Sequence, residues 1–289
     1  MKENTKHIDL LSKTEIDDLY ARPVFNDDER AIYFKLNERE TLAAEQYGNL
    51  RTRLYFILQT GYFKAKQQFY SFFIEDVIDD AIYVNKLYFN SKEILSGKIT
   101  REYLKSQKDS ILKLYSYLLF SDNIKEKITE HLCSLIKIYP KHNNALRQLI
   151  IYFEQKNIVL PTYRNLQELF GQAYRIEKNR LNNLMLSIPE NIKTQLNTLI
   201  KNDDGISDLN TIKSDQKDFQ YTAVKLEVDK ANKIASLYRF SKFFIPKLEI
   251  SKNAIQYYAD VTEQYASARI RRLKEPQQWL RAVLLKMLL

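Results

Sequence analysis

Residues Thr162–Leu186, with the sequence TYRNLQELFGQAYRIEKNRLNNLML, decide the fold class of this chain. Apolar side chains recur along the stretch at helical spacing: Leu166, Leu169, Phe170, Ala173, Leu181 and Leu184. This spacing places them on one face of an α-helix, whereas a half-buried strand requires alternation. Only five glycines and six prolines interrupt the 289 residues, so long helices joined by short turns are expected throughout. The sequence therefore predicts an all-α fold of successive small helical bundles.

Three helix starts are marked by a small polar residue that is followed three positions later by Glu. The pairs are Ser12 with Glu15, Asn26 with Glu29, and Asn37 with Glu40. In such a capping box each side chain accepts a hydrogen bond from the backbone amide of the other residue. After the turn Tyr47-Gly48-Asn49 we expect a fourth helix from Leu50 to about Thr60. The first segment thus ends in a helix-turn-helix-like unit.

Further helices are expected by the same spacing over residues 72–89, 91–95, from 100 onward, 122–139, 142–156, 162–186, 217–243, 251–271 and 276–289. The run Val224–Val228 alternates like a strand, but its apolar positions also continue at helical spacing, so we interpret it as helix. Residues 202–216 are rich in turn formers and are the best linker. We divide the chain into segments 1–70, 71–120, 121–200 and 201–289, the first three with helix-turn-helix-like units.

Positive charge is concentrated in the later part of the chain. The formal net charge is +9, with 0 in residues 1–70, −3 in residues 71–90, +7 in residues 91–195 and +5 in residues 196–289. An excess of this kind, spread along helices, favours binding to a phosphate backbone through counterion release. Lys-rich proteins that bind no nucleic acid share it, so charge alone leaves the function open.

Three helices each combine an apolar face with a polar, cationic face. The candidate DNA-contacting residues are Asn49, Arg51, Thr52 and Arg53 on the helix from Leu50; Arg101, Lys105 and Lys108 on the helix from Thr100; and Arg164, Asn165, Arg175, Lys178 and Asn179 on the helix from Thr162. Arg and Asn form paired hydrogen bonds with base edges, whereas Lys and Thr mostly hold phosphates. Any amphipathic surface helix also has a charged outer face, so each helix taken alone favours a solvated surface.

A fourth cationic cluster is the run Arg269–Lys274, which includes Arg271 and Arg272. It is denser than the other three and could grip phosphates. It could equally be a solvated helix end whose charges complement the helix dipole.

Evidence for enzymatic chemistry is thin. The three histidines are far apart, and the chain has no phosphate-binding loop, dinucleotide fingerprint or nucleophile elbow. Asp79-Asp80 and Asp203-Asp204 fit solvated charge better than a metal site, and most of the twenty tyrosines fit core and rim positions. The single cysteine, Cys133, lies on the apolar face of a predicted helix, where a buried inert thiol is expected.

The longest run of uncharged, mainly apolar residues is Leu54–Phe63, far short of a membrane span. The first nine residues alternate charges and lack the apolar core of a signal peptide. We therefore expect a cytoplasmic, nucleoid-associated protein that does not contact a membrane.

Three motifs resemble the large transposases of the Tn-three type. They are Tyr33-Phe34-Lys35-Leu36 with Asn49–Leu54 and Leu58-Gln59; Asn157–Gln167 with Ala173; and Tyr265-Ala266 with Arg271-Arg272-Leu273 and Gln278-Trp279-Leu280. They follow the family's order along nearly the whole chain. Two stretches depart from the family: Thr60–Phe63 replaces an Arg-Tyr-Pro-like continuation, and Lys105–Lys108 replaces an Arg-rich helix start. A Lys side chain can still bind phosphate, but it lacks the planar guanidinium with which Arg forms paired hydrogen bonds to bases.

The resemblance implies an N-terminal region that recognises the terminal inverted repeats of a transposon as double-stranded DNA. Catalysis in such proteins belongs to a later Asp-Asp-Glu domain of ribonuclease H type, which binds two divalent metal ions of the Mg type. We expect this chain to contain no such domain, and therefore no cofactor and no catalytic residues. Its partners would be the rest of the transposase and a second transposase copy.

A second hypothesis is a helical scaffold for protein interaction, with merely solvated cationic faces and a partner bound by the apolar helix 276–289. Steep salt dependence of DNA binding favours the first hypothesis, and salt-insensitive self-association favours the second.

Overall fold

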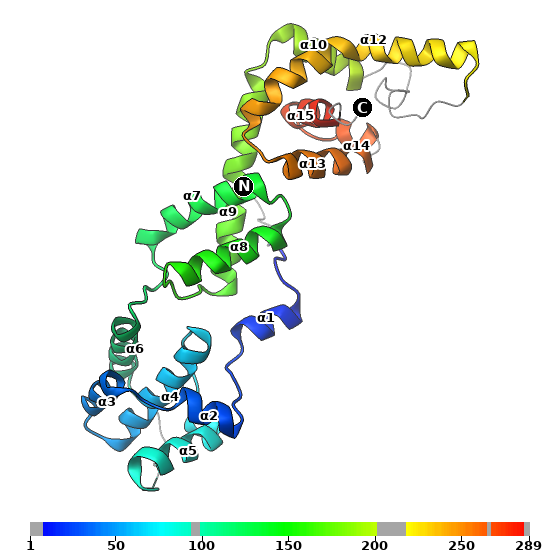
Figure 1. Ribbon diagram of the computed structural model, residues 1–289. Helices are drawn as coiled ribbons and strands as arrows, with labels where there is room; N and C mark the ends of the chain where they lie inside the picture. The colour runs from blue at the N-terminus through cyan, green and yellow to red at the C-terminus, as the bar shows by residue number, and fades with distance from the viewer. Residues whose placement is uncertain (1–7, 94–98, 201–217, 265–266, 286–289) are drawn as a thin grey trace. The chain divides into compact units, whose positions relative to one another are not determined.

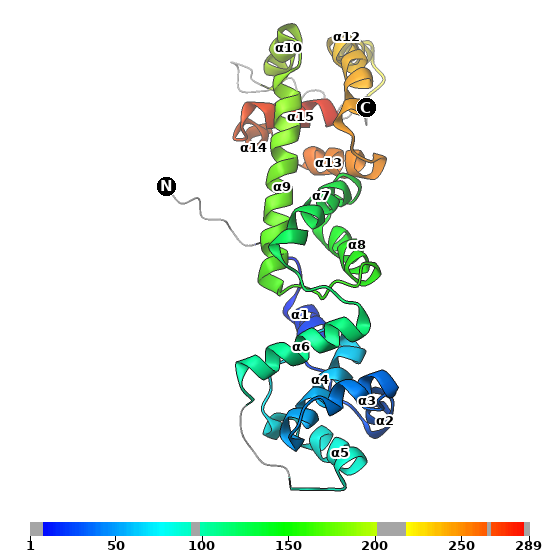
Figure 2. The same ribbon diagram turned by 90° about the vertical axis from the view of Figure 1, so that its left-hand side faces the viewer.

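A computed structural model describes residues 8–93, 99–200, 218–264 and 267–285 (Figures 1 and 2). The regular elements in these ranges are all helices, and strand-like pairing is limited to one isolated bridge between Leu118 and Ile158. The all-α prediction is confirmed. None of the helices in these ranges is long and apolar enough to cross a membrane.

The chain divides into two compact units. The N-terminal unit comprises residues 9–126 and 149–167, and the C-terminal unit comprises residues 1–8, 127–148 and 168–289. Three helices contribute residues to both units: α7 (Asp122–Ile138), α8 (His142–Gln155) and α9 (Tyr163–Leu186). Figure 2 shows α9 as one unbroken helix, as the helical spacing of apolar residues over 162–186 predicts. The four predicted segments stay a prediction.

The N-terminal unit begins with the three helices that the capping boxes predict. They are α1 (Lys13–Tyr20), α2 (Asp27–Tyr33) and α3 (Glu38–Glu45), and each has both hydrogen bonds of its box. In the third box, for example, Asn37 N donates to Glu40 Oε2 and Glu40 N donates to Asn37 Oδ1, both at 3.0 Å. Local sequence alone therefore placed these three helix starts correctly.

The fourth helix, α4 (Leu50–Lys66), is the central core helix of the N-terminal unit. It is buried on all sides from Leu54 to Phe63, so the predicted polar face on this helix is wrong. The polar groups of Tyr55 and Gln59 bond the backbone of the segment that follows the helix. The helix also extends beyond the predicted end at Thr60, to Lys66, where Gln67 adopts the left-handed conformation and its amide donates to the Phe63 carbonyl oxygen.

Aromatic side chains fill this core, with Phe34, Phe56, Tyr62 and Phe63 almost fully buried. Gly61 allows the Phe34 ring to lie directly against the α4 backbone. A Cβ atom at Gly61 would overlap Cδ1 and Cε1 of that ring. The contact therefore requires glycine in the middle of a helix, where it otherwise weakens stability.

Gly61→Ala is expected to destabilise the N-terminal unit by about 1–3 kcal/mol, because the added methyl group overpacks the core. The matched change Gly171→Ala, at a mid-helix position of α9 with open space around the Cα, should stabilise by about 0.5–1 kcal/mol. Urea denaturation followed by circular dichroism measures both changes. Stabilisation by both alanines would contradict the packing of Phe34 on α4.

Three further elements complete the first part of the N-terminal unit: η1 (Ile74–Val77), α5 (Ile78–Phe89) and α6 (Arg101–Tyr115). The predicted helix from residue 72 is wrong at its start, since a 3-10 turn precedes α5. The predicted short helix 91–95 is wrong over residues 91–93, which are not helical, and its remaining two residues lie outside the described ranges. Helix α6 begins within one residue of the predicted start at Thr100, which caps it by accepting a hydrogen bond from Tyr103 N.

A buried carboxylate ties α5 to α2 and α4. Asp80, 4% exposed, accepts hydrogen bonds from Arg30 Nε at 2.8 Å and from Tyr62 Oη at 2.7 Å. Arg22 adds a third contact at 3.8 Å. Burial, and then the hydrogen bond to Asp80, raise the pKa of Tyr62. The prediction that Asp79-Asp80 is a solvated pair is therefore wrong for Asp80, although Asp79 is exposed.

The C-terminal unit is built around α10 (Glu190–Ile200), α12 (Tyr221–Phe244), η2 (Ile245–Leu248), α13 (Lys252–Gln264), α14 (Ser267–Arg271) and α15 (Glu275–Leu285). Helix α10 was not predicted, and the single expected helix 251–271 is two helices. Helix α12 confirms the helical interpretation of Val224–Val228. The predicted linker 202–216 lies outside the described residues.

Helix α15 is packed into the core of the C-terminal unit, against α13 and α10 (Figure 1). Trp279 is 4% exposed, and its Nε1 donates to Asn197 Oδ1 at 2.8 Å. Ala282, Val283 and Leu284 are also buried. This part of the predicted apolar end is therefore not a free partner-binding surface, and residues 286–289 lie outside the described ranges.

Cys133 lies half-buried on α7, and its thiol contacts the Ala173 carbonyl oxygen at 3.9 Å. Burial, followed by the charge of Glu177, raises the pKa of the thiol. A raised pKa keeps the thiol protonated at neutral pH and so makes it a poor nucleophile.

Candidate nucleic-acid interface

The outer face of α9 in the C-terminal unit carries three of the predicted residues. Arg175, Lys178 and Asn179 are exposed and lie within one helical turn of each other, and Asn182 continues the stripe half-buried. Leu181 and Met185 are buried in the core of the same unit. The predicted separation of an apolar and a polar face on this helix is confirmed.

The acidic residue within this stretch of α9 does not cancel its positive charge at the surface. Glu177 is 4% exposed and accepts two hydrogen bonds from Arg180, at 2.8 and 2.6 Å. Arg180 also donates to the Leu248 carbonyl oxygen at 2.6 Å. The hydrogen bond to Glu177 raises the pKa of Arg180. This internal pair ties α9 to η2 and leaves the exposed cations of the stripe unneutralised by Glu177.

The run Arg269–Lys274 forms the second cationic element of this unit, at the turn between α14 and α15. Arg271, Arg272 and Lys274 are exposed. The backbone of the turn is fixed, because Gln278 Nε2 donates to the carbonyl oxygens of Arg271 and Leu273 at 3.0 and 2.7 Å. A fixed backbone presents these charges at a defined position rather than on a mobile tail.

A hollow of about 300 Å³ joins these two elements within the C-terminal unit. Lys178 and Asn182 of α9 line one side, and Leu273 of the basic turn lines another. Arg272 and Lys274, the exposed neighbours of Leu273 in the sequence, do not themselves line the hollow. The fold thus brings the α9 stripe and the apolar residue of the basic turn to one hollow, although the two elements are almost one hundred positions apart in the sequence. Sequence spacing gave no signal for this, nor for Tyr258 and Arg281, which also line the hollow.

In the N-terminal unit, α6 presents the predicted residues Arg101, Lys105 and Lys108 on its exposed side. Two acids, Glu102 and Asp109, are exposed on the same helix. Hydrogen bonds to its own backbone amide and to the Thr100 hydroxyl lower the pKa of Glu102. Glu102 therefore stays charged at the positive end of the helix dipole, which is a structural role.

The predicted residues at the start of α4 are placed less favourably for contact with DNA. Asn49 is exposed, but its Oδ1 accepts hydrogen bonds from Thr52 N and Thr52 Oγ1 at 2.8 and 3.0 Å, so it serves as a helix cap. Thr52 is only 4% exposed. The Arg53 guanidinium lies 5.5 Å from the centre of the Phe89 ring, and Arg51 is half-buried. The burial of Thr52 removes its hydroxyl from the phosphate contacts we expected.

The start of α9 belongs to the N-terminal unit and carries Arg164 and Asn165. Arg164 is exposed and Asn165 is half-buried, with Asn165 N donating to Thr162 Oγ1 at 3.3 Å. Tyr163 anchors the helix start, because its hydroxyl oxygen accepts from Leu10 N and Leu11 N at 3.0 and 3.2 Å. Arg164 is therefore presented from a fixed helical turn.

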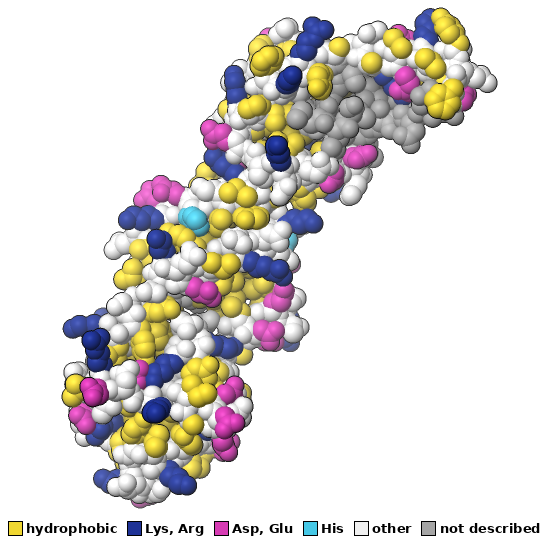
Figure 3. All heavy atoms as spheres, viewed as in Figure 1, with side chains coloured by type: hydrophobic (Ala, Val, Ile, Leu, Met, Phe, Trp, Pro, Cys, Tyr) yellow, Lys and Arg dark blue, Asp and Glu magenta, His cyan; other side chains and the backbone are white. Residues whose placement is uncertain are grey.

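On the face drawn in Figure 3, Lys and Arg side chains are spread singly and in small groups, with Asp and Glu between them. Among the described residues, no three His, Cys, Asp or Glu side chains gather as metal ligands would.

One family model matches residues 10–173, which is more than half of the chain, and its description is domain of unknown function (DUF4158). No curated protein matches the chain.

Proposed function

The chain belongs to the DUF4158 family, and we propose that it binds double-stranded DNA, specifically the terminal inverted repeats of a transposon. The observation that carries this proposal is the meeting of the α9 stripe with the basic turn in the C-terminal unit. A fixed backbone holds the cations of both elements, which favours phosphate contacts in a defined register. Asn179 and Asn182, beside Arg175, supply groups that pair with base edges.

The N-terminal unit would add a second and weaker contact through the exposed cations of α6 and through Arg164. Two modest contacts on one chain raise affinity by effective concentration, and a site longer than one helical turn is then read only when both contacts form. The proposal assigns DNA positioning to this chain and no catalysis.

The resemblance to transposases of the Tn-three type supports the choice of transposon ends as the DNA. In that role the chain is the N-terminal part of a transposase, in the cytoplasm at the nucleoid. The two divalent metal ions and the catalytic carboxylates would belong to another domain of the same protein. The partners would then be DNA, the remaining transposase chain and a second transposase copy.

Charge reversal at the two joined elements tests this proposal. Lys178→Glu combined with Arg272→Glu is expected to weaken binding to inverted-repeat duplex at least tenfold. It should also lower the slope of log affinity against log salt by about 2, since each lost phosphate contact removes about 0.9. Fluorescence anisotropy over a series of salt concentrations measures both quantities.

Lys242→Glu combined with Lys247→Glu is the matched control, because both lysines are exposed in the same unit, neither lines the hollow beside the α9 stripe, and the net charge changes by the same amount. It should change affinity only through net charge. If the control and the Lys178→Glu, Arg272→Glu variant lose equal affinity for the duplex and have equal salt slopes, the α9 stripe and the basic turn are not the contact surface.

A helical interaction scaffold is the second candidate, and exposed apolar side chains on and beside α12 favour it. Phe219, Tyr221 and Phe243 are 91%, 82% and 77% exposed. The surface for a partner would be α12 rather than the packed helix α15. Salt-insensitive self-association, measured by sedimentation equilibrium, together with absent DNA binding would favour this candidate.

A further inference from the structure

Helix α12 carries a line of uncharged side chains, which we call the α12 seam, along a largely exposed side. Its members recur at alternating steps of three and four residues: Tyr221, Val224, Val228, Ala231, Ala235 and Tyr238. All of them are exposed except Ala235, which is half-buried. Alternating steps of three and four are the heptad spacing with which one helix packs along another. The seam therefore fits a helix as its partner.

The packing of α12 within its own unit uses a different side of the helix. Lys230, Leu237, Ser241 and Phe244 are buried, and at about 100° per residue their side lies about 140° around the axis from the seam. Figure 1 shows the first part of α12 extending past the other labelled helices of this unit, and Figure 3 shows hydrophobic side chains over this part. The seam is thus not the face with which α12 joins the core.

The order of residues along the seam makes it complementary to itself. A second α12 laid antiparallel, with the two-fold axis between Asp229 and Lys230, places Tyr221 opposite Tyr238, Val224 opposite Ala235, and Val228 opposite Ala231. Each valine then faces an alanine, so larger and smaller side chains interdigitate along the pair. Parallel pairing would instead stack valine on valine and alanine on alanine, which no single distance between the helices suits. Self-complementarity of this kind is what a two-fold contact between identical chains requires.

We propose that α12 binds the α12 helix of a second copy of this chain, antiparallel and through the α12 seam. The seam spans about 27 Å, because residues 221–238 rise about 1.5 Å each. A contact of this length falls among small interfaces, so we expect a reversible dimer that forms between about 1 and 200 μM. The pairing goes beyond the proposed DNA contacts, which use other surfaces, and it names a surface for the second copy.

Sedimentation equilibrium of the full chain without DNA, over this concentration range, tests the pairing. Val228 lies beside the two-fold axis, so Val228→Glu places two carboxylates close together and should weaken the dimer at least about tenfold. Leu226→Glu is the matched control and should leave the dimer unchanged. Leu226 is 48% exposed, similar to Val228 at 53%, but it lies on the opposite side of the helix from the seam. Because both residues are exposed, neither change removes a core contact.

Disulfide cross-linking tests the antiparallel orientation, in chains that also carry Cys133→Ala to remove the native thiol. A chain with Val224→Cys, mixed with a chain with Ala235→Cys, should form a cross-linked dimer under oxidising conditions. Neither chain should cross-link alone, because identical positions lie about 16 Å apart along the axis, beyond the Cα separation of about 7 Å that a disulfide spans.

Three results would overturn the inference: a monomer at every concentration, equal losses for Val228→Glu and Leu226→Glu, or cross-links that form between identical cysteines and not in the mixture. No DNA is present in these experiments. Their failure would therefore leave the DNA-binding proposal standing, and a failure of DNA binding would leave the helix pair standing.

Discussion

Asp80→Ala is expected to lower the free energy of unfolding of the N-terminal unit by about 3–5 kcal/mol. The substitution leaves the Arg30 guanidinium, only 16% exposed, without the carboxylate that accepts its Nε hydrogen bond and paired only with the exposed Asp27. It also deprives the buried Tyr62 hydroxyl of its acceptor in the centre of the aromatic core. Removal of one partner of a buried ion pair costs far more than removal of a surface charge, because the remaining charge has lost its water as well.

The neighbouring residue provides the control for this experiment. Asp79 precedes Asp80 on the same turn of α5 but is exposed, so Asp79→Ala should change stability by no more than about 0.5 kcal/mol. Urea denaturation followed by circular dichroism gives the two free energies. Hydrogen exchange measured on peptides of α4 and α5 assigns the loss to the N-terminal unit, since the single tryptophan, Trp279, reports the other unit. Similar small losses for both variants would contradict the buried anchor at Asp80.

The parts of the fold that the sequence predicted correctly are those that local chemistry decides. The three capping boxes need only two residues each, so Ser12, Asn26 and Asn37 marked their helix starts without any knowledge of tertiary contacts. Helix α9 was also predicted correctly from the sequence, because one of its faces is buried and the other is exposed. Local hydrogen bonding and amphipathic spacing therefore account for the correct assignments.

The errors arise where tertiary contacts decide. Helix α4 carries Arg51, Thr52, Tyr55 and Gln59 along what looks like a polar face, but Tyr55 and Gln59 are amphipathic and pack inward while bonding backbone groups. A helix that is buried all round has no amphipathic signal to read. Asp80 was misassigned for a related reason, because its partners Arg30 and Tyr62 lie 50 and 18 positions away. A carboxylate at such a position looks solvated until the chain is folded.

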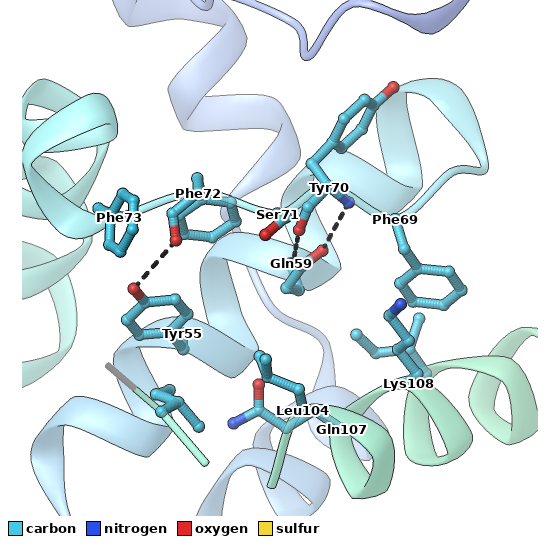
Figure 4. A pocket seen from close by; sticks show the side chains of 12 residues that line it. Tyr55, Gln59, Phe69, Tyr70, Ser71, Phe72, Phe73, Leu104, Gln107 and Lys108 are labelled. Carbon is cyan, nitrogen blue, oxygen red and sulfur yellow. Dashed lines mark hydrogen bonds between the residues drawn. The ribbon is translucent and has the colours of Figure 1, made fainter. Parts of the chain in front are cut away.

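The candidate interface likewise combines a feature that local sequence predicts with one that only tertiary contacts decide. The exposure of Arg175, Lys178 and Asn179 followed from the helical period, but their meeting with the Arg269–Lys274 turn depends on the packing of α9, α13 and α15. Long-range contacts of this kind leave no trace in the spacing of either segment. The hollow that Tyr55 and Gln107 line in the N-terminal unit (Figure 4) was likewise beyond sequence analysis, since its lining comes from α4, the segment 69–73 and α6.

Preference for inverted-repeat DNA is the second large effect that we expect. If base contacts from the α9 stripe add to phosphate contacts, the chain should bind its own transposon end at least a hundredfold more tightly than a scrambled duplex, about 3 kcal/mol. Phosphate contacts alone cannot give this difference, because they are the same for every sequence. Affinity for both duplexes should also fall steeply as salt rises, since counterions are released on binding.

The most direct test is a titration of labelled inverted-repeat duplex, from the transposon that flanks this gene, against a scrambled duplex at two salt concentrations. We expect a preference of at least about a hundredfold for the inverted repeat, together with salt-sensitive binding to both duplexes. Equal affinity for the two duplexes would contradict recognition of transposon ends and leave only a general cationic surface. Absence of binding to either duplex would contradict the DNA-binding proposal itself and favour the interaction scaffold.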